Sequence, residues 1–119
     1  MKEDNAIKVK SFLFSVRIVK MAQYLLKQTS YPEHKIITQI IKSGTSIGAN
    51  IRESEYAESP DDFVHKLRIA LKETNETEYW LDILYQCEYI TEEQYNSLII
   101  DCKELLKLLI SIIKKLTNH

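Results

Sequence analysis

Apolar residues recur at intervals of three and four positions along most of the chain, which is the pattern of amphipathic α-helices. Four such segments can be separated, and they cover residues 5–27, 33–56, 60–88 and 92–117. Only short polar stretches lie between them. The predicted fold class is therefore all-α, with a single domain over residues 1–119 that forms an antiparallel up-down-up-down four-helix bundle.

Each segment has an apolar stripe that we expect to face the core. In the third and fourth segments this stripe has the heptad spacing of helices that pack side by side. The expected core positions are Val9, Phe12, Val16, Val19 and Leu26, with Leu13 and Ile18 widening this stripe, then Ile37, Ile40 or Ile41, Ile47 and Ile51, then Phe63, Leu67, Ala70, Thr74, Thr77, Leu81 and Leu84, and finally Leu98, Cys102, Leu105, Leu109, Ile112 and Leu116. Surplus apolar residues on the last two helices predict a contact between subunits.

Local signals mark the ends of the predicted helices. Pro32 disfavours helix at the residue before it and suits the first turn of the next helix. Residues 59–62 combine a capping serine, a proline and two acids, which is the clearest helix start in the sequence. Thr91 and Gln94 have the spacing of a capping box, so the connection before the fourth helix is short.

Residues 43–53 contain both glycines of the chain. Gly44 and Gly48 lie four positions apart, so they share one helix face and let a neighbouring helix approach closely. The expected neighbour is a bulky side chain of the third helix, either Trp80 or Tyr79. A phosphate-binding loop is not indicated, because no strand precedes the glycines and no Gly-Lys-Ser/Thr sequence follows them.

Polar residues beside the apolar stripes are expected to fix the alignment of the helices. They can form a partly buried hydrogen-bond network, and ordinary exposed ion pairs are the alternative for the same residues. The residues expected to serve close packing and helix register are Gly44, Ser46, Gly48, Asn50, Glu53, Glu73 and Trp80.

The residues usual in catalytic and metal sites are sparse. Cys87 and Cys102 have no metal-binding or redox spacing, and no histidine has a suitable Ser or Cys nucleophile beside it. Metal sites in bundles use Glu-x-x-His pairs, whereas the chain offers only Asp62-x-x-His65. We therefore expect no catalytic residue, no metal, no cofactor and no small-molecule substrate, and a protein that is not an enzyme.

The apolar residues never form a run long enough to span a membrane, and the first residues lack the apolar region of a signal peptide. A cytoplasmic protein without a membrane partner is therefore expected.

Charge is distributed unevenly, although the net charge is only −1. Residues 1–52 carry nine basic residues against three acidic ones, whereas residues 53–93 carry three against twelve. Basic residues that cluster on one side of the bundle would form a surface for RNA or DNA phosphates, and otherwise they form a solvated face. The candidate nucleic-acid-binding residues are Lys8, Lys10, Arg17, Lys20, Lys27, Lys35, Lys42 and Arg52.

Three stretches together resemble a known family. They are Lys42-Ser-Gly-Thr-Ser-Ile-Gly-Ala-Asn-Ile-Arg-Glu53, Ser59-Pro-Asp-Asp-Phe-Val-His-Lys-Leu-Arg-Ile-Ala-Leu-Lys-Glu73 and Glu76-Thr-Glu-Tyr-Trp-Leu81. On these stretches, and from about residue 5 to residue 116, the chain closely resembles the bacterial 23S rRNA-intervening-sequence proteins. The resemblance implies small bundles that assemble into homopentameric rings, some of them encoded within insertions in ribosomal RNA genes. A related branch is the accessory variability protein of diversity-generating retroelements, which binds nucleic acid and a reverse transcriptase.

Two functional hypotheses follow. The leading one is a non-enzymatic, homo-oligomeric binding or scaffold module that binds structured RNA or a ribonucleoprotein partner through its basic face. The alternative is a purely structural protein–protein assembly module, in which the basic face contacts the acidic third helix of the next subunit.

Overall fold

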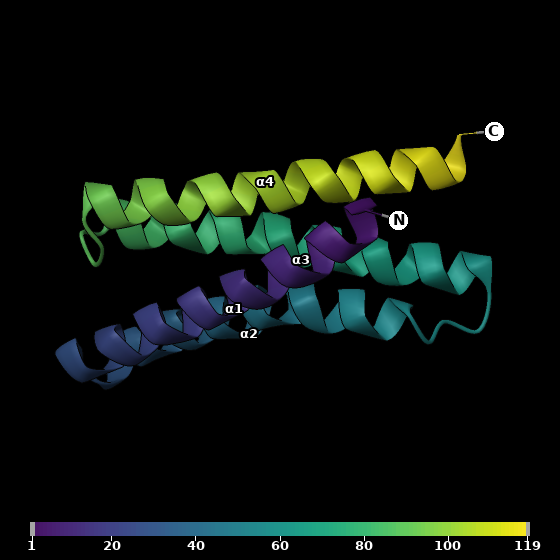
Figure 1. Ribbon diagram of the computed structural model, residues 1–119. Coiled ribbons are helices and arrows are strands. Elements are labelled where there is room, and N and C mark those ends of the chain that lie inside the picture. Colours follow the sequence, from purple (N-terminus) through teal and green to yellow (C-terminus); the bar gives the residue numbers. More distant parts are fainter. Residues whose placement is uncertain (1, 119) are drawn as a thin grey trace.

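The computed structural model describes residues 2–118, and these residues form four helices: α1 (Lys2–Gln28), α2 (Tyr31–Ser54), α3 (Pro60–Gln86) and α4 (Glu92–Thr117). Successive helices run in alternate directions, so both ends of the described chain lie at the same end of the bundle (Figure 1). Each helix contacts the helices before and after it, and α1 also contacts α4. The prediction of an all-α four-helix bundle is confirmed.

The helix ends form as the local sequence signals predict. Ser59 accepts a hydrogen bond from the backbone N–H of Asp62 at the start of α3, at 3.0 Å. Thr91 and Gln94 form a reciprocal capping box at the start of α4. The α2 helix begins at Tyr31, with Pro32 in its first turn, where a missing N–H costs nothing. The bundle is elongated, with extents of 48 × 24 × 19 Å.

The core residues of α2, α3 and α4 agree well with the predicted stripes, except that Leu116 of α4 is 36% exposed. Leu67, Leu81 and Leu84 of α3 and Leu105 and Leu109 of α4 are all buried, with at most 2% of their surface exposed. Within the described residues, no helix is long and apolar enough to cross a membrane.

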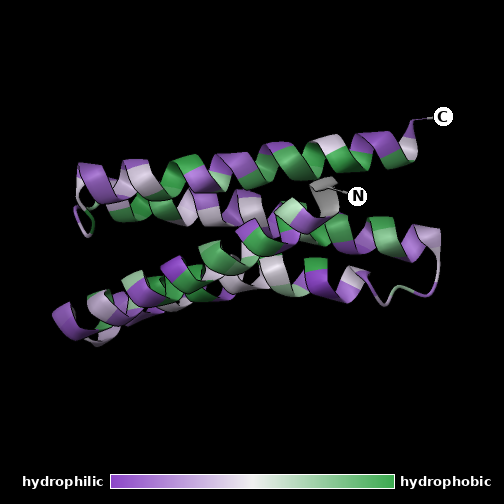
Figure 2. Cartoon of the chain, viewed as in Figure 1, coloured by the Kyte–Doolittle hydropathy of each residue, from purple (hydrophilic) through white to green (hydrophobic). Residues whose placement is uncertain are grey.

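The predicted core face of α1 is wrong for most of its residues, although Ile18 at its edge is buried as expected. Val9 and Phe12 are 58% and 53% exposed, whereas the buried positions are Ile7, Ser11, Phe14, Ile18, Ala22 and Leu25. Two apolar stripes with the same spacing lie on opposite faces of this helix, and spacing alone does not say which one turns inward. In Figure 2, hydrophobic residues, drawn in green, are visible along the length of α1 between hydrophilic ones.

The two glycines bring α2 close to α1, and not to α3 as predicted. A Cβ atom added at Gly44 would lie 2.9 Å from Cγ2 of Ile18, and one added at Gly48 would lie 3.5 Å from the backbone of Ser11. Trp80 instead donates from its indole N–H to Glu76 at 3.2 Å. The face of α2 that turns toward α3 carries Ser43, one position before Gly44, so the glycine face is rotated away from α3.

Candidate binding surface on α1 and α2

Three of the eight basic candidates are paired with acids of their own chain. Lys8 lies 3.1 Å from Glu55 of the α2–α3 connection, and Lys10 pairs with Glu104 of α4. Arg17 pairs with Asp101 at 2.5 Å and also donates to Ser97 Oγ at 2.7 Å. Their charge is therefore partly neutralised within the monomer, and the pairs made by Lys10 and Arg17 help to join α1 to α4.

The other five candidates are exposed, and they are spread along the α1–α2 hairpin. Lys35 and Arg52 each place their charge 5.8 Å from an aromatic ring, that of Tyr31 and that of Phe12 respectively. The remaining three are Lys20, Lys27 and Lys42. The structure thus brings the eight residues onto two neighbouring helices without gathering them into one cluster.

An exposed apolar surface runs along the outside of α1. Val9, Phe12 and Leu13 are each more than half exposed, and Val16 and Val19 continue the same face with partial exposure. We call these five residues the outer stripe of α1. Their spacing of three and four is that of a helix seam, and among the described residues all five side chains of this seam remain at least partly exposed.

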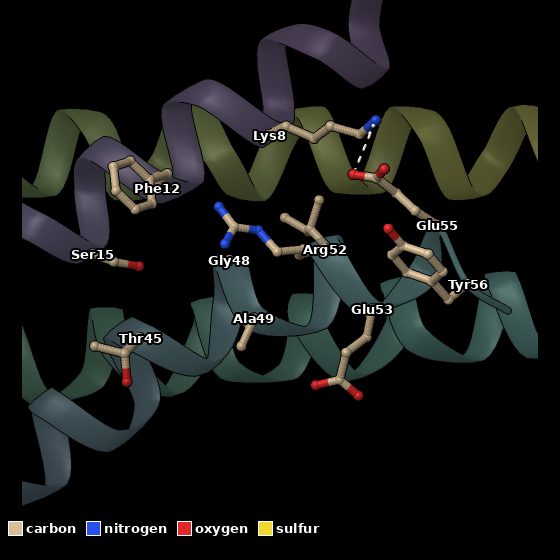
Figure 3. Close-up of a pocket in the computed structure, with 11 residues that line it drawn as sticks. Lys8, Phe12, Ser15, Thr45, Gly48, Ala49, Arg52, Glu53, Glu55 and Tyr56 are labelled. Atoms are coloured by element: carbon tan, nitrogen blue, oxygen red, sulfur yellow. Dashed lines mark ion pairs between the residues drawn. The ribbon is translucent and has the colours of Figure 1, made fainter.

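An open groove of about 620 Å³ lies between α1 and α2, and Phe12 of the outer stripe is one of the residues that line it. Gly48 and Ala49 have little or no side chain, so the wall formed by α2 is low at this point. In Figure 3 the Lys8–Glu55 ion pair lies at one end of the groove, and the guanidinium of Arg52 is directed toward Phe12. A side chain from another molecule could enter this groove, with apolar contacts on one side and a cation beside it.

The predicted register residues make mostly local bonds. Ser46 donates to the carbonyl of Lys42 at 2.7 Å, and Asn50 donates to the carbonyl of Ser46 at 2.8 Å, so both bonds lie within α2. Glu53 pairs with Lys66 of α3 at 3.2 Å, which does join two helices. Burial, followed by repulsion from Glu76, raises the pKa of Glu73 above its ordinary value.

The buried polar contacts between helices involve other residues. The hydroxyl of Thr77 donates to Ser43 Oγ at 2.9 Å, and both side chains are fully buried between α3 and α2. The Sγ atom of Cys102 donates to the carbonyl of Thr74 at 3.5 Å, and Ser15 donates to the carbonyl of Gly44 at 3.1 Å. The sequence does contain a signal for this layer, since small and hydroxyl residues interrupt the apolar stripe of α3.

Replacing Thr77 with valine is expected to lower the free energy of unfolding by about 1 kcal/mol, because the buried Ser43 hydroxyl loses its partner on α3 and keeps only its 3.4 Å contact with the Ile40 carbonyl. The double variant Thr77→Val with Ser43→Ala removes both hydroxyls and should recover most of that loss. Urea unfolding of the four proteins of this double-mutant cycle measures the coupling. Strictly additive effects would show that the Ser43–Thr77 hydrogen bond does not stabilise the bundle.

A second polar contact links α3 and α4 near their connection. The hydroxyl of Tyr95 donates to Asp82 at 2.6 Å, and the ring of Tyr95 stacks on Tyr85 with 4.5 Å between centroids. The hydrogen bond to Asp82, followed by burial, raises the pKa of Tyr95 to about 12.

Stability is therefore expected to fall as the pH rises from 10 to about 12. In that interval the unfolded chain loses the Tyr95 proton, whereas the folded protein keeps it and so binds more protons. Tyr95→Phe keeps the ring but removes the proton, so its unfolding free energy should fall less steeply over this interval. Urea unfolding at several pH values compares the two proteins, and identical slopes would contradict the role of the Asp82 hydrogen bond.

The described residues offer little for catalysis or metal binding. Across residues 2–118, no three His, Cys, Asp or Glu side chains lie together as metal ligands. Both cysteines are free; Cys87 is exposed, and Cys102 is buried. Burial raises the pKa of the Cys102 thiol to about 12, which keeps it protonated.

The chain is similar to a described protein family and to a solved structure. The sequence profile described as 23S rRNA-intervening sequence protein matches residues 3–111. A protein of unknown function from the S23 ribosomal protein family of Bacteroides thetaiotaomicron is 56% identical, and its crystal structure superposes with a TM-score of 0.89. That match covers 94% of this chain and 98% of the other. No curated protein matches the chain. With the family profile matching nearly its whole length, this four-helix bundle belongs to the 23S rRNA-intervening sequence protein family.

Proposed function

We propose that the protein is a non-enzymatic assembly module that binds further copies of itself through the outer stripe of α1. The observation that carries this proposal is the exposure of Val9, Phe12 and Leu13, at 58%, 53% and 55%, on consecutive turns of one helix. Contiguous apolar surface of this kind on a soluble protein typically marks an interaction site. The resemblance to bundles that form homopentameric rings supports a second copy of the chain as the partner.

The electrostatics of the monomer favour this function over a surface devoted to phosphates. Lys8, Lys10 and Arg17 are held by carboxylates of the same chain, so fewer basic side chains are free to bind RNA. The two free thiols suit a protein that works in a reducing compartment, in accord with a cytoplasmic scaffold.

Light scattering at a series of micromolar concentrations tests the proposal. We expect a mass that is a multiple of 14.0 kDa, with a pentamer as the family-based expectation. A particle of 14.0 kDa at every concentration would overturn self-assembly as the function of this surface.

A nucleic-acid-binding function is the second candidate, and one feature of α1 favours it. Lys20, Tyr24 and Lys27 share one exposed face, and neither lysine takes part in the ion pairs found among the described residues. Lysines that flank an exposed aromatic ring suit the phosphates and bases of a single-stranded RNA segment.

A fluorescence titration with an RNA that contains single-stranded loops tests this second candidate. Binding at low ionic strength that weakens with added salt, and weakens further in Lys20→Ala/Lys27→Ala, would support it. An absence of binding at low ionic strength would exclude it.

A further inference from the structure

The α3 helix has a second partly exposed face, separate from its core stripe. Its residues are spaced by four, three, four and three positions, as in a helix seam. They are Ile69, Glu73, Glu76, Trp80 and Ile83. We call these five residues the side seam of α3. The seam borders α2, because Lys66, three positions before its first residue, pairs with Glu53.

The middle of the side seam is acidic. Glu73 and Glu76 lie three positions apart, and burial and the charge of Glu76 both raise the pKa of Glu73. Lys42 and Lys72 oppose this effect without cancelling it. The seam therefore combines two apolar ends with carboxylates that a further cation would stabilise.

The charged residues of α1 beside its outer stripe have the opposite sign to Glu73 and Glu76. From residue 5 to residue 32 the chain contains no Asp or Glu, so every charged side chain of α1 beside this stripe is basic, although Lys8, Lys10 and Arg17 are partly neutralised by their ion pairs. Arg52 adds a guanidinium that lies over Phe12, and no ion pair to this arginine is found among the described residues. Two outer stripes facing each other would bring like charges together, which disfavours a symmetric α1–α1 contact.

We propose that the outer stripe of α1 in one copy packs against the side seam of α3 in a second copy, with Arg52 facing Glu76. The inference rests on the proposed function and specifies its interface. The outer stripe is apolar, the side seam has apolar ends on either side of two carboxylates, and the basic residues beside the outer stripe are opposite in charge to those carboxylates. Because the two surfaces differ, one contact leaves the side seam of the first copy and the outer stripe of the second copy unused, and repetition of this contact closes a ring or extends a filament.

The groove between α1 and α2 suits this contact. It opens beside Phe12 and Arg52, and its wall on α2 is lowered by Gly48 and Ala49. The indole of Trp80 is partly exposed, and its edge meets the ring of Tyr79 at a centroid distance of 5.1 Å. In the proposed contact, the Tyr79–Trp80 pair of one copy faces the α1–α2 groove of the next copy, beside the guanidinium of Arg52.

A charge exchange tests the pairing, with light scattering of the full chain as the measurement. Arg52→Glu and Glu76→Arg each place like charges across the contact, and each is expected to weaken assembly at least tenfold. The double variant carries the exchanged pair and should assemble within about threefold of the original protein. Lys103→Glu, on an exposed position of α4 outside both surfaces, is the matched control and should assemble normally.

The outcomes separate this inference from the function on which it rests. If the original protein assembles but either single variant assembles equally well, or the double variant is as weak as the single ones, the α1–α3 pairing is wrong. If the original protein stays monomeric at all concentrations, the proposed function fails, and the pairing fails with it. Circular dichroism of each variant confirms that the bundle is folded before its mass is compared.

Discussion

Replacing Gly44 with leucine is expected to lower the free energy of unfolding by about 3 kcal/mol. Even a Cβ atom at this position would lie 2.9 Å from Cγ2 of Ile18, 3.1 Å from its Cγ1 and 3.3 Å from its Cβ. Ile18 is fully buried and branched at Cβ, so it has no free rotamer into which it can retreat. The α1 and α2 helices would have to separate, which would also break the hydrogen bond from Ser15 to the Gly44 carbonyl.

Gly48→Ala is the matched control, because a Cβ atom there meets Ser11 at an ordinary contact distance of 3.5 Å. Alanine is the better helix former by about 1 kcal/mol, so this variant should be as stable as the original protein or more stable. Urea unfolding followed by circular dichroism measures both. Equal stability of Gly44→Leu and the original protein would show that the close approach of the helices is not set by this glycine.

The sequence predicts the number, order and approximate ends of the helices because these depend on local chemistry. Heptad spacing, the capping residues at Ser59 and Thr91 and the near absence of glycine and proline act within a few residues of each other. The sequence predicts that the glycines are a place of close approach, but it does not predict that the neighbouring helix is α1. Which helix lies opposite Gly44 depends on how α2 is rotated about its axis, and that rotation is set by all the other helices together.

The face of α1 could not be chosen from the sequence for a related reason. Its inner stripe, with Ile7, Phe14 and Ile18, and its outer stripe are similar in hydrophobicity and have the same period. Only a partner decides which of two equivalent stripes is buried in the monomer. The α1 helix has two apolar faces, and only one of them is covered in the monomer. The other face is therefore available to bind a partner.

The ion pairs of the basic residues could not be predicted from the sequence. Their presence on α1 and α2 was evident from composition, but their pairing was not. Lys10 and Arg17 meet Glu104 and Asp101 of α4, more than eighty positions away in the chain. A charge count over residues 1–52 therefore overstates the positive charge that is free to bind a partner. The acidity of the third helix is evident from the count over residues 53–93, but the sequence alone does not say that Glu73 and Glu76 lie on one face with Ile69, Trp80 and Ile83 outside the core.

The double variant Val9→Ser/Phe12→Ser is expected to convert the assembly to monomers. Both side chains are more than half exposed in the monomer, and covering the exposed parts at an interface contributes about 2 kcal/mol together, roughly thirtyfold in Kd for each contact. A closed ring repeats the contact at every subunit boundary, so the loss applies to each of them. Light scattering should therefore show a 14.0 kDa particle at concentrations where the original protein is oligomeric.

Thermal unfolding distinguishes loss of assembly from loss of folding in this variant. An oligomer is stabilised by mass action, so the Tm of the original protein should rise with protein concentration, whereas the Tm of the variant should not. Ile100→Ser is the matched control, because Ile100 is 64% exposed on α4 and belongs to neither surface. If Ile100→Ser dissociates the assembly while Val9→Ser/Phe12→Ser leaves it intact, the interface lies on α4, and the outer stripe of α1 needs another partner.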